Sequence, residues 1–306
     1  MDFLTAKCAK EREKGNAEFI GLRPYELIFS SFEFFVCFAV NILIMSKKIG
    51  LALSGGGARG FAHVGVLKVL AEHNIPIDMI AGTSAGAFVG GALAAGMSVE
   101  QIAAMADKIG FANMMRPSLS FGGLLSNAPM GRFVARHFPV TRIEEMIIPF
   151  SAVAFDLQTS EQVTLQDSGD IVLAIRASCA VPGVFAPVRD ELGRLLVDGG
   201  VVSPMPVETV RSMGADIVIA VDLMACGATF RANSRTGVGI MIQSALSLLR
   251  VTAKSEHSSA DIVIEPQIAH LRPDQIGKRP EFIALGERAA SESIARIQKL
   301  IDTDEA

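Results

Sequence analysis

Residues 77–95 have the sequence IDMIAGTSAGAFVGGALAA, and this stretch decides the fold. Its apolar first part predicts a short strand over 77–81, and its run of small residues predicts a helix over 84–95. Between them, Gly82-Thr83-Ser84-Ala85-Gly86 is a turn with a serine at the junction of strand and helix. A strand, a tight turn and a closely packed helix are typical of α/β proteins with a parallel sheet.

Ser84 is a candidate nucleophile because of its place on this turn. A serine hydroxyl is a weak nucleophile until a base removes its proton and its oxygen is held at the substrate. A sharp strand-to-helix turn strains the serine backbone and presents the oxygen. The flanking positions must then be small, and Gly82 and Gly86 satisfy this requirement. The five-residue pattern alone is common by chance, so the strand before it and the helix after it carry the inference.

A glycine loop, Gly55-Gly56-Gly57-Ala58-Arg59-Gly60, follows a strand predicted over 49–54 and precedes a helix predicted over 61–73. Consecutive glycines leave backbone N–H groups open to a developing oxyanion. The positive N-terminal end of the next helix adds to that field. Three roles are open for Arg59: to orient the loop, to attract a phosphate-bearing substrate, or to be a surface charge.

The same loop fits a rival motif, because Gly55-x-Gly57-x-x-Gly60 satisfies the dinucleotide-binding fingerprint. That fingerprint needs an acidic residue at the end of the next strand. Asp78 lies at a suitable separation but at the start of that strand, so nucleotide binding ranks below acyl transfer. A Walker A site is excluded because no Gly-Lys-Ser/Thr follows.

Asp198 lies in Leu196-Val197-Asp198-Gly199-Gly200, at the end of a strand predicted over 195–198. An aspartate there can project into a cleft at the carboxyl end of the sheet. An aspartate before glycine is equally a common turn residue. The segment alone leaves both interpretations open.

Together, the ordered motifs Gly-Gly-Gly-Ala-Arg-Gly, Gly-Thr-Ser-Ala-Gly and Asp-Gly-Gly resemble the patatin-like phospholipase family. The stretch from Ala177 to Pro187 resembles it too, and the similarity runs from about Ile49 to Val207. The resemblance implies a three-layer α/β/α fold with a mostly parallel central sheet. It also implies a lipid acyl hydrolase that cleaves fatty-acyl esters of phospholipids or lysophospholipids at a membrane surface, without a metal or organic cofactor.

The resemblance assigns a role to each motif. Ser84 would be the nucleophile and Asp198 its general base, in a Ser-Asp dyad that forms an acyl-enzyme. Gly55, Gly56, Gly57, Ala58 and Arg59 would form or support the oxyanion hole. We therefore expect His257 and His270 on the surface and His63 packed in a helix near the glycine loop. The alternative function is a lipid-binding regulatory module with little turnover.

The remainder of the chain alternates between strand and helix patterns from residue 46 to residue 306, which predicts one domain. Residues 111–130 are less regular and are either a mobile apolar flap or an ordinary loop. The further strands are predicted over 150–155, 162–165, 216–223 and 261–265, and the further helices over 99–109, 171–177, 239–254 and 281–300.

The first 45 residues differ from the rest and have no counterpart in the family. Residues 27–45 are mostly apolar and long enough to span a bilayer, although Glu33 and Asn41 oppose insertion. Two interpretations stay open: a membrane anchor, or a wrongly extended start with translation beginning at Met45. No small-residue cleavage site follows, so a cleaved signal peptide is not expected.

Composition sets outer limits on the function. The chain of 306 residues has a formal net charge of −4, which gives no electrostatic footprint for nucleic acid. The four cysteines show no metal-type spacing and predict free thiols in a reducing, cytoplasmic compartment, with or without membrane association. They are Cys8, Cys37, Cys179 and Cys226.

Overall fold

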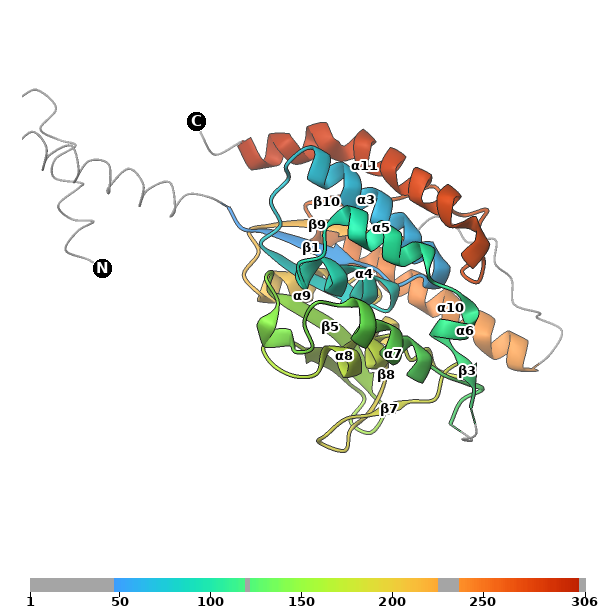
Figure 1. Ribbon diagram of the computed structural model, residues 1–306. Helices are drawn as coiled ribbons and strands as arrows, with labels where there is room; N and C mark the ends of the chain where they lie inside the picture. Colours follow the sequence, from blue (N-terminus) through green and yellow to red (C-terminus); the bar gives the residue numbers. More distant parts are fainter. Residues whose placement is uncertain (1–46, 119–121, 225–236, 303–306) are drawn as a thin grey trace, which may run out of the picture. The chain divides into compact units, whose positions relative to one another are not determined.

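The apolar strands assemble into one central sheet in the computed structural model, which describes residues 47–118, 122–224 and 237–302 (Figure 1). Each strand of the sheet's middle is buried on both faces, which explains the near-continuous apolar runs in the sequence. Within the described ranges the sheet has eight strands. They are β1 (Ile49–Leu53), β2 (Met79–Thr83), β5 (Phe150–Asp156), β6 (Glu161–Leu165), β7 (Val188–Arg189), β8 (Leu195–Asp198), β9 (Ile217–Val221) and β10 (Ile262–Ile264).

The strand order is β10-β9-β1-β2-β5-β8-β7, and β6 pairs with β5. The five strands from β10 to β5 are parallel, whereas β6, β7 and β8 join antiparallel. Leu53 of β1 lies level with Gly82 of β2 and with Val221 of β9. The loops that follow these three strands therefore meet at one edge of the sheet, where open α/β sheets bind ligands.

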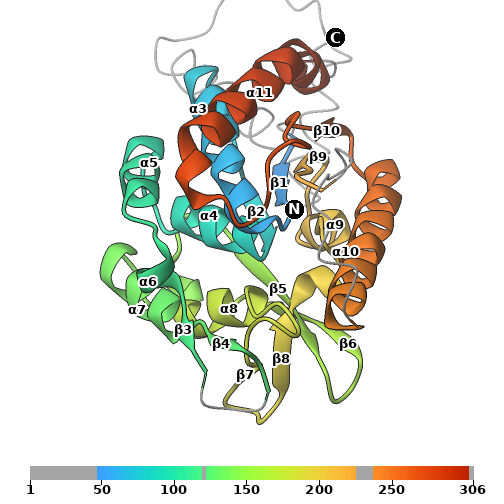
Figure 2. The ribbon, with the colours of Figure 1, turned by 90° about the vertical axis from the view of Figure 1, so that its right-hand side faces the viewer.

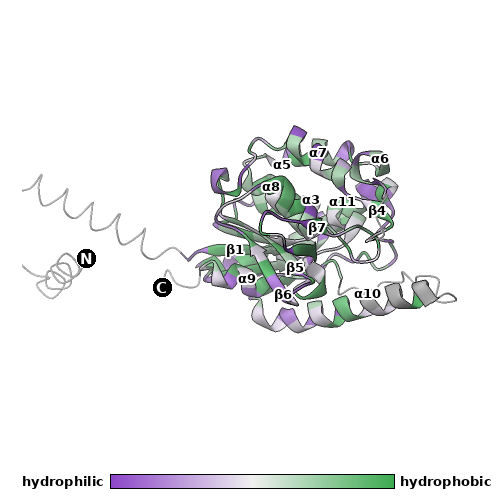
Figure 3. Cartoon of the chain, turned by 90° about the horizontal axis from the view of Figure 1, so that it is seen from below, coloured by the Kyte–Doolittle hydropathy of each residue, from purple (hydrophilic) through white to green (hydrophobic). Residues whose placement is uncertain are grey.

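Helices cover both faces of this sheet, as the sequence predicted (Figures 2 and 3). Alternate side chains of a strand point to opposite faces. Leu51 and Leu53 of β1 accordingly join the larger apolar cluster, whereas Ala52 joins a smaller one with Val210. On the larger face lie α3 (Phe61–Glu72), α4 (Ala85–Ala94), α5 (Val99–Asp107), α7 (Ala128–His137), α8 (Ile171–Ser178) and α11 (Arg279–Asp302); on the other lie α9 (Val207–Ser212) and α10 (Gly237–Glu256).

The C-terminal helix α11 packs directly on α3. A Cβ atom on Gly65 of α3 would lie 2.0 Å from the carbonyl oxygen of Ile283, and one on Gly286 would lie 2.0 Å from that of Ala62. The two helix backbones are therefore in contact at two glycines, and no larger side chain fits there. Phe282 is fully buried beside this contact. The helix predicted over 281–300 thus completes the larger face of the sheet.

Residues 111–130 contain more structure than the sequence predicted. A short helix, α6 (Phe111–Met114), precedes the hairpin strands β3 (Arg116–Pro117) and β4 (Leu125–Ser126), and α7 follows. Met114 is buried, but Leu124 is 71% exposed, so the apolar side chains divide between core and surface. Helix α7 was not predicted; its first turn contains Pro129 and its buried face includes Gly131.

Short 3-10 turns complete the described elements: η1 (Gly57–Gly60), η2 (Ile143–Glu145), η3 (Gly199–Val201), η4 (His257–Ser259) and η5 (Ile276–Lys278). In Figure 3 the inner helix α8 is largely green, whereas α10 carries bands of green, white and purple. None of the helices within the described ranges is long and apolar enough to cross a bilayer. The predictions for residues 1–45, Cys8, Cys37 and Cys226 lie outside the described residues.

Candidate active site

Ser84 occupies the turn between β2 and α4 in a strained backbone conformation. Its φ is 55° and its ψ is −119°, a region that residues with a side chain rarely adopt. Such strain persists only where the surrounding structure enforces it, and it is typical of functional sites. The backbone N–H of Ser84 donates to Oγ of Ser178 at 2.9 Å, and the residue is 8% exposed. The serine is thus fixed by the strand before it, the helix after it and α8 beside it.

The glycines on either side of Ser84 allow β2 and α4 to approach this closely. A Cβ atom on Gly82 would lie 2.5 Å from the backbone of Gly86 and Ala87. A Cβ atom on Gly86 would lie 2.0 Å from the carbonyl oxygen of Leu53 in β1. Backbone atoms cannot move aside as a flexible side chain can. The turn therefore requires glycine at both positions.

Asp198 is the last residue of β8. This strand pairs with β5 along the same edge of β5 that pairs with β2. Its Oδ1 accepts a hydrogen bond from the N–H of Gly200 at 2.8 Å. Its Oδ2 is buried and accepts no hydrogen bond from any residue that the structure describes. Burial raises the pKa of Asp198 to about 6, while the nearby Ser84 hydroxyl and the Gly200 N–H lower it. The structure thus brings Ser84 and Asp198 together, with one carboxylate oxygen free to take a proton.

Cys179 lies beside both residues, one position after α8. Burial raises the pKa of this thiol well above its ordinary value, and the charge of Asp198 raises it further. The thiol is therefore neutral near pH 7 and is a packing group against the site, in agreement with a free cysteine.

The glycine loop follows β1 and passes close to Ser84, since a Cβ atom on Gly55 would contact the Ser84 Cβ at 3.4 Å. Three of its N–H groups already have acceptors: Gly55 donates to Pro204, Ala58 to Pro273 and Arg59 to Gly56. The N–H groups of Gly56 and Gly57 donate to no acceptor in the described part of the chain. Gly56 and Gly57 are therefore the loop positions that remain as candidate N–H donors to an anion.

Arg59 is buried and acts as a strut for this loop. Its Nε and Nη2 both donate to the carbonyl oxygen of Leu271, at 3.2 and 3.0 Å, and its Nη1 donates to that of Leu223 at 3.4 Å. Of the three roles that the sequence left open, loop orientation is the one that this geometry supports. The surface-charge interpretation is wrong, because only 4% of Arg59 is exposed.

Asp78, which the rival dinucleotide motif requires, lies at the opposite end of the sheet from the glycine loop. Its Oδ2 accepts the N–H of Ile49, the first residue of β1, at 2.6 Å. Asp156 is also engaged elsewhere, since its Oδ1 accepts the N–H of Gln158 in the turn after β5. Neither carboxylate takes part in the cluster around Ser84.

Two of the histidine predictions are confirmed by the structure. His63 is fully buried under the glycine loop, with its Nε2 at 2.8 Å from the carbonyl oxygen of Ser54. Burial lowers the pKa of His63 to about 4, so the ring is neutral and Nε2–H donates to that carbonyl. His270 is 58% exposed at its side chain and pairs with Glu281 on the surface.

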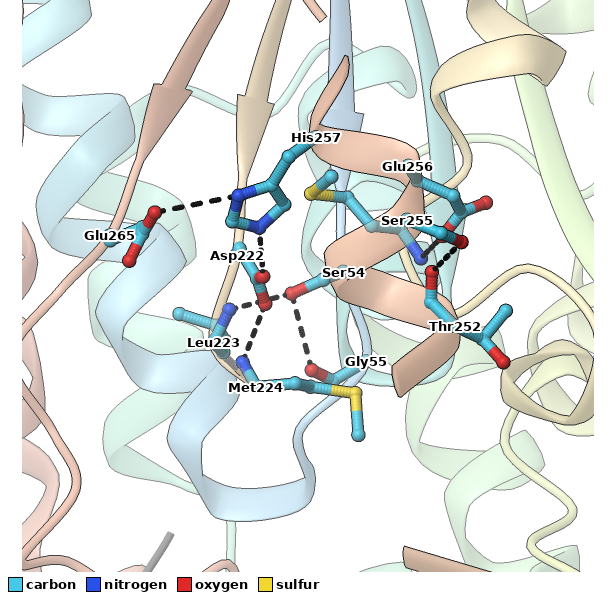
Figure 4. Close-up of polar contacts among 11 residues, drawn as sticks. Ser54, Gly55, Asp222, Leu223, Met224, Thr252, Ser255, Glu256, His257 and Glu265 are labelled. Carbon is cyan, nitrogen blue, oxygen red and sulfur yellow. Dashed lines mark hydrogen bonds and ion pairs between the residues drawn. The ribbon is translucent and has the colours of Figure 1, made fainter. Parts of the chain in front are cut away.

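The surface prediction for His257 holds only in part, because its side chain is 23% exposed and also contacts a buried group. Its Nε2 lies 2.6 Å from Oδ2 of Asp222, a fully buried carboxylate at the end of β9 (Figure 4). The neighbouring Glu256 accepts hydrogen bonds from Oγ of Ser203 and from the N–H of Met205. This polar cluster was not predicted because the run around His257 resembles an exposed helix end. Asp222, at the carboxyl end of an apolar strand, was the available signal.

The chain matches known proteins over the segment that carries these motifs. It is 41% identical over 181 residues to an uncharacterized NTE family protein of Mycobacterium bovis, covering 58% of this chain and 49% of that one. It is 35% identical to the patatin-like phospholipase domain-containing protein 7 of Mus musculus and 36% to the lysophospholipase nte1 of Neurospora crassa. Those two matches cover 59% of this chain but only 14% and 12% of the relatives.

Among solved structures, VipD from Legionella pneumophila aligns with a TM-score of 0.48 and 15% identity, over 81% of this chain and 66% of that one. The chain thus spans about half the length of its mycobacterial relative and a small part of the animal and fungal ones. The family model for patatin-like phospholipases matches residues 51–211, more than half of the chain and the segment that holds the elbow, the glycine loop and Asp198. The chain therefore belongs to the patatin-like phospholipase family.

Proposed function

We propose that this protein is a serine acyl hydrolase that cleaves fatty-acyl esters of phospholipids or lysophospholipids through a Ser84–Asp198 dyad. The observation that carries the proposal is the strained Ser84 next to a buried aspartate whose Oδ2 has no hydrogen-bond donor among the described residues. A carboxylate with an ordinary pKa is a weak base, and a pKa of about 6 brings Asp198 closer to the working pH.

In the first half of the reaction, Oγ of Ser84 attacks the ester carbonyl while its proton passes to Oδ2 of Asp198. The carbonyl oxygen becomes an oxyanion, which the N–H groups of Gly56 and Gly57 bind. When the tetrahedral intermediate collapses, the ester C–O bond breaks and Asp198 returns the proton to the departing alcohol. The acyl group stays on Ser84.

In the second half, a water molecule attacks the acyl carbonyl and gives its proton to Asp198. The bond between the acyl carbon and Oγ of Ser84 breaks, and the fatty acid leaves. Asp198 then returns the proton to Oγ, and the dyad is restored. Every proton is accounted for by one aspartate, so the scheme uses no histidine.

The lipid class rests on the family and on the lysophospholipase among the similar proteins. A lipid substrate places the reaction at a membrane or micelle surface, where the ester is presented.

A fluorophosphonate probe tests the nucleophile directly. We expect the wild-type protein and the Ser258→Ala control, which alters an exposed serine, to be labelled on the peptide that contains Ser84. Ser84→Ala should not be labelled. The same proteins are then assayed on vesicles of phosphatidylcholine and on micelles of lysophosphatidylcholine, with fatty-acid release as the readout.

Wild-type activity on either lipid, lost in both Ser84→Ala and Asp198→Asn, supports the dyad. Folded wild-type protein that is neither labelled nor active refutes the enzyme and favours a lipid-binding regulatory module. Labelling at Ser84 that persists at full rate in Asp198→Asn would show that another group is the base.

A further inference from the structure

The end of α10 holds two acidic or basic side chains that the reaction scheme does not use. Glu256 is the last residue of α10, and His257 begins η4 (Figure 4). Both lie beyond residue 211, where the match to the family model ends. Each reaches a different backbone segment, and both segments flank the glycine loop.

Glu256 accepts two hydrogen bonds from the segment 203–205. Its Oε1 accepts Oγ–H of Ser203 at 2.6 Å, and its Oε2 accepts the N–H of Met205 at 2.9 Å. The carbonyl oxygen of Ser203 in turn accepts the hydroxyl of Thr83 at 2.7 Å. Thr83 immediately precedes Ser84, so the carboxylate is two hydrogen bonds away from the elbow.

The same segment also supports the glycine loop. The carbonyl oxygen of Pro204, which lies between the two groups that Glu256 holds, accepts the N–H of Gly55 at 3.0 Å. A carboxylate that accepts two hydrogen bonds fixes its partners more firmly than neutral groups do. Glu256 therefore fixes, through one short segment, the residue before the nucleophile and the first residue of the loop.

His257 supports the loop from the other side. It pairs with Asp222, whose Oδ1 accepts the N–H of Met224 at 2.6 Å. Between them, Leu223 donates its N–H to Oγ of Ser54 at 2.9 Å and accepts from Arg59. The side chain of Leu223 also packs on Gly56, since a Cβ atom there would lie 3.3 Å away. The contacts of His257 thus extend through segment 222–224 to Gly56, one of the two residues whose N–H groups are assigned to the oxyanion.

We propose that Glu256 and His257 are positioning residues for the acyl transfer, and that they hold the elbow and the glycine loop in register through the segments 203–205 and 222–224. The proposal rests on the function proposed above. Oxyanion donors act over a narrow range of distances, about 2.7–3.1 Å, and a displacement of about 1 Å can lower a rate about 100-fold. Burial raises the pKa of Glu256 to about 7, whereas the hydrogen bonds from Ser203 and Met205 lower it.

Steady-state kinetics on a water-soluble ester, with the full chain, test the role of Glu256. We expect Glu256→Ala to lower kcat about 10- to 100-fold with KM within about twofold, since the loop acts on the transition state. Glu256→Gln keeps the shape and one acceptor, and should recover most of kcat. Ser255→Ala is the matched control, because the hydroxyl of this exposed neighbour donates to the carbonyl oxygen of Thr252 within α10.

Two further variants separate positioning from folding. Ser203→Ala removes a single hydroxyl and should give a smaller loss of kcat. This loss should not add to that of Glu256→Ala, because both variants remove the contact between Glu256 and segment 203–205. His257→Ala removes the separate contact to Asp222 and segment 222–224, so its loss of kcat should be largely additive with that of Glu256→Ala. Amide hydrogen exchange of residues 54–60 and of Val202, Ser203 and Met205 should be faster in Glu256→Ala, and unchanged in Ser255→Ala.

The outcomes distinguish the two proposals. Wild-type protein that is neither labelled nor active refutes the proposed function, and the exchange data then still test the structural link on their own. If the wild type is active, equal kcat in Glu256→Ala and in the control refutes the positioning role. An unchanged exchange rate in the glycine loop would refute it as well, and so would a loss confined to KM.

Discussion

Asp198→Asn is expected to abolish hydrolysis and, at neutral pH, to stabilise the fold. In the folded protein burial raises the pKa of Asp198 from 3.8 to about 6. A raised pKa means that the folded state favours the protonated carboxyl. The free energy of unfolding contributed by this group is therefore greatest below pH 3.8 and falls as the pH rises towards 6. Asparagine is uncharged at every pH, so the variant escapes this loss.

The size of the effect follows from the two pKa values. At about 1.36 kcal/mol for each pKa unit, the difference corresponds to an upper limit of about 3 kcal/mol. The gain is reduced because the amide nitrogen of asparagine would take the place of Oδ2, which has no partner among the described residues. We expect Asp198→Asn to be more stable than the wild type by about 1–3 kcal/mol at pH 8 and by much less at pH 4.

Urea unfolding at pH 4, 6 and 8 measures this difference. The matched control is Asp167→Asn, an exposed position with a φ of 62° that asparagine also tolerates. We expect the stability of the control to follow that of the wild type at all three pH values. A gap between Asp198→Asn and the wild type that stays constant with pH would contradict the reasoning. So would a wild type that gains on the variant as the pH rises, because that behaviour belongs to a well-paired, ionised aspartate.

Three further predictions concern the site. For a water-soluble ester, kcat/KM should fall about tenfold for each pH unit below about 6, because only ionised Asp198 accepts the Ser84 proton; a flat acid limb would exclude Asp198 as the base. Gly86→Ala should lower the free energy of unfolding by about 3 kcal/mol or more, because the added Cβ meets the Leu53 carbonyl. The control Gly277→Ala lies in open space and should change this free energy by less than about 0.5 kcal/mol, and urea titration compares the two variants. Arg59→Lys should lower thermal stability by the equivalent of about 1–3 kcal/mol, since lysine cannot reproduce the forked contact; an unchanged melting temperature would argue against the strut.

The fold could be predicted from the sequence because its main signals are local. The strands β1, β2 and β9 are short apolar runs bounded by glycine or polar residues. Gly82 and Gly86 mark a turn in which these two positions admit no side chain. Element type and order follow from such patterns. The observed three-layer fold then follows from the rule that a sheet of parallel strands joined by helices needs helices on both faces.

Other features depend on contacts between residues that are far apart in the chain. His257 meets Asp222 across 35 positions, and Glu256 meets Ser203 across 53. A histidine in a polar helix end gives the same local pattern whether it faces water or a buried carboxylate. The buried role of Arg59 was hidden for the same reason, since its acceptor Leu271 is 212 positions away. Helix α7 was missed because Pro129 and Gly131, near its start, are residues typical of turns and give the local sequence the pattern of a loop.

The contact between α3 and α11 determines where this unit can be divided. The family segment ends at residue 211, within α9, before β9, β10 and α11. A gene fragment that stopped there would expose the edge of β1 and would leave Gly65 and Ala62 without the helix that covers them. An open strand edge of this kind invites aggregation. The segment that the family model matches is therefore shorter than the unit that folds, and any transfer of this site into another chain must extend through α11.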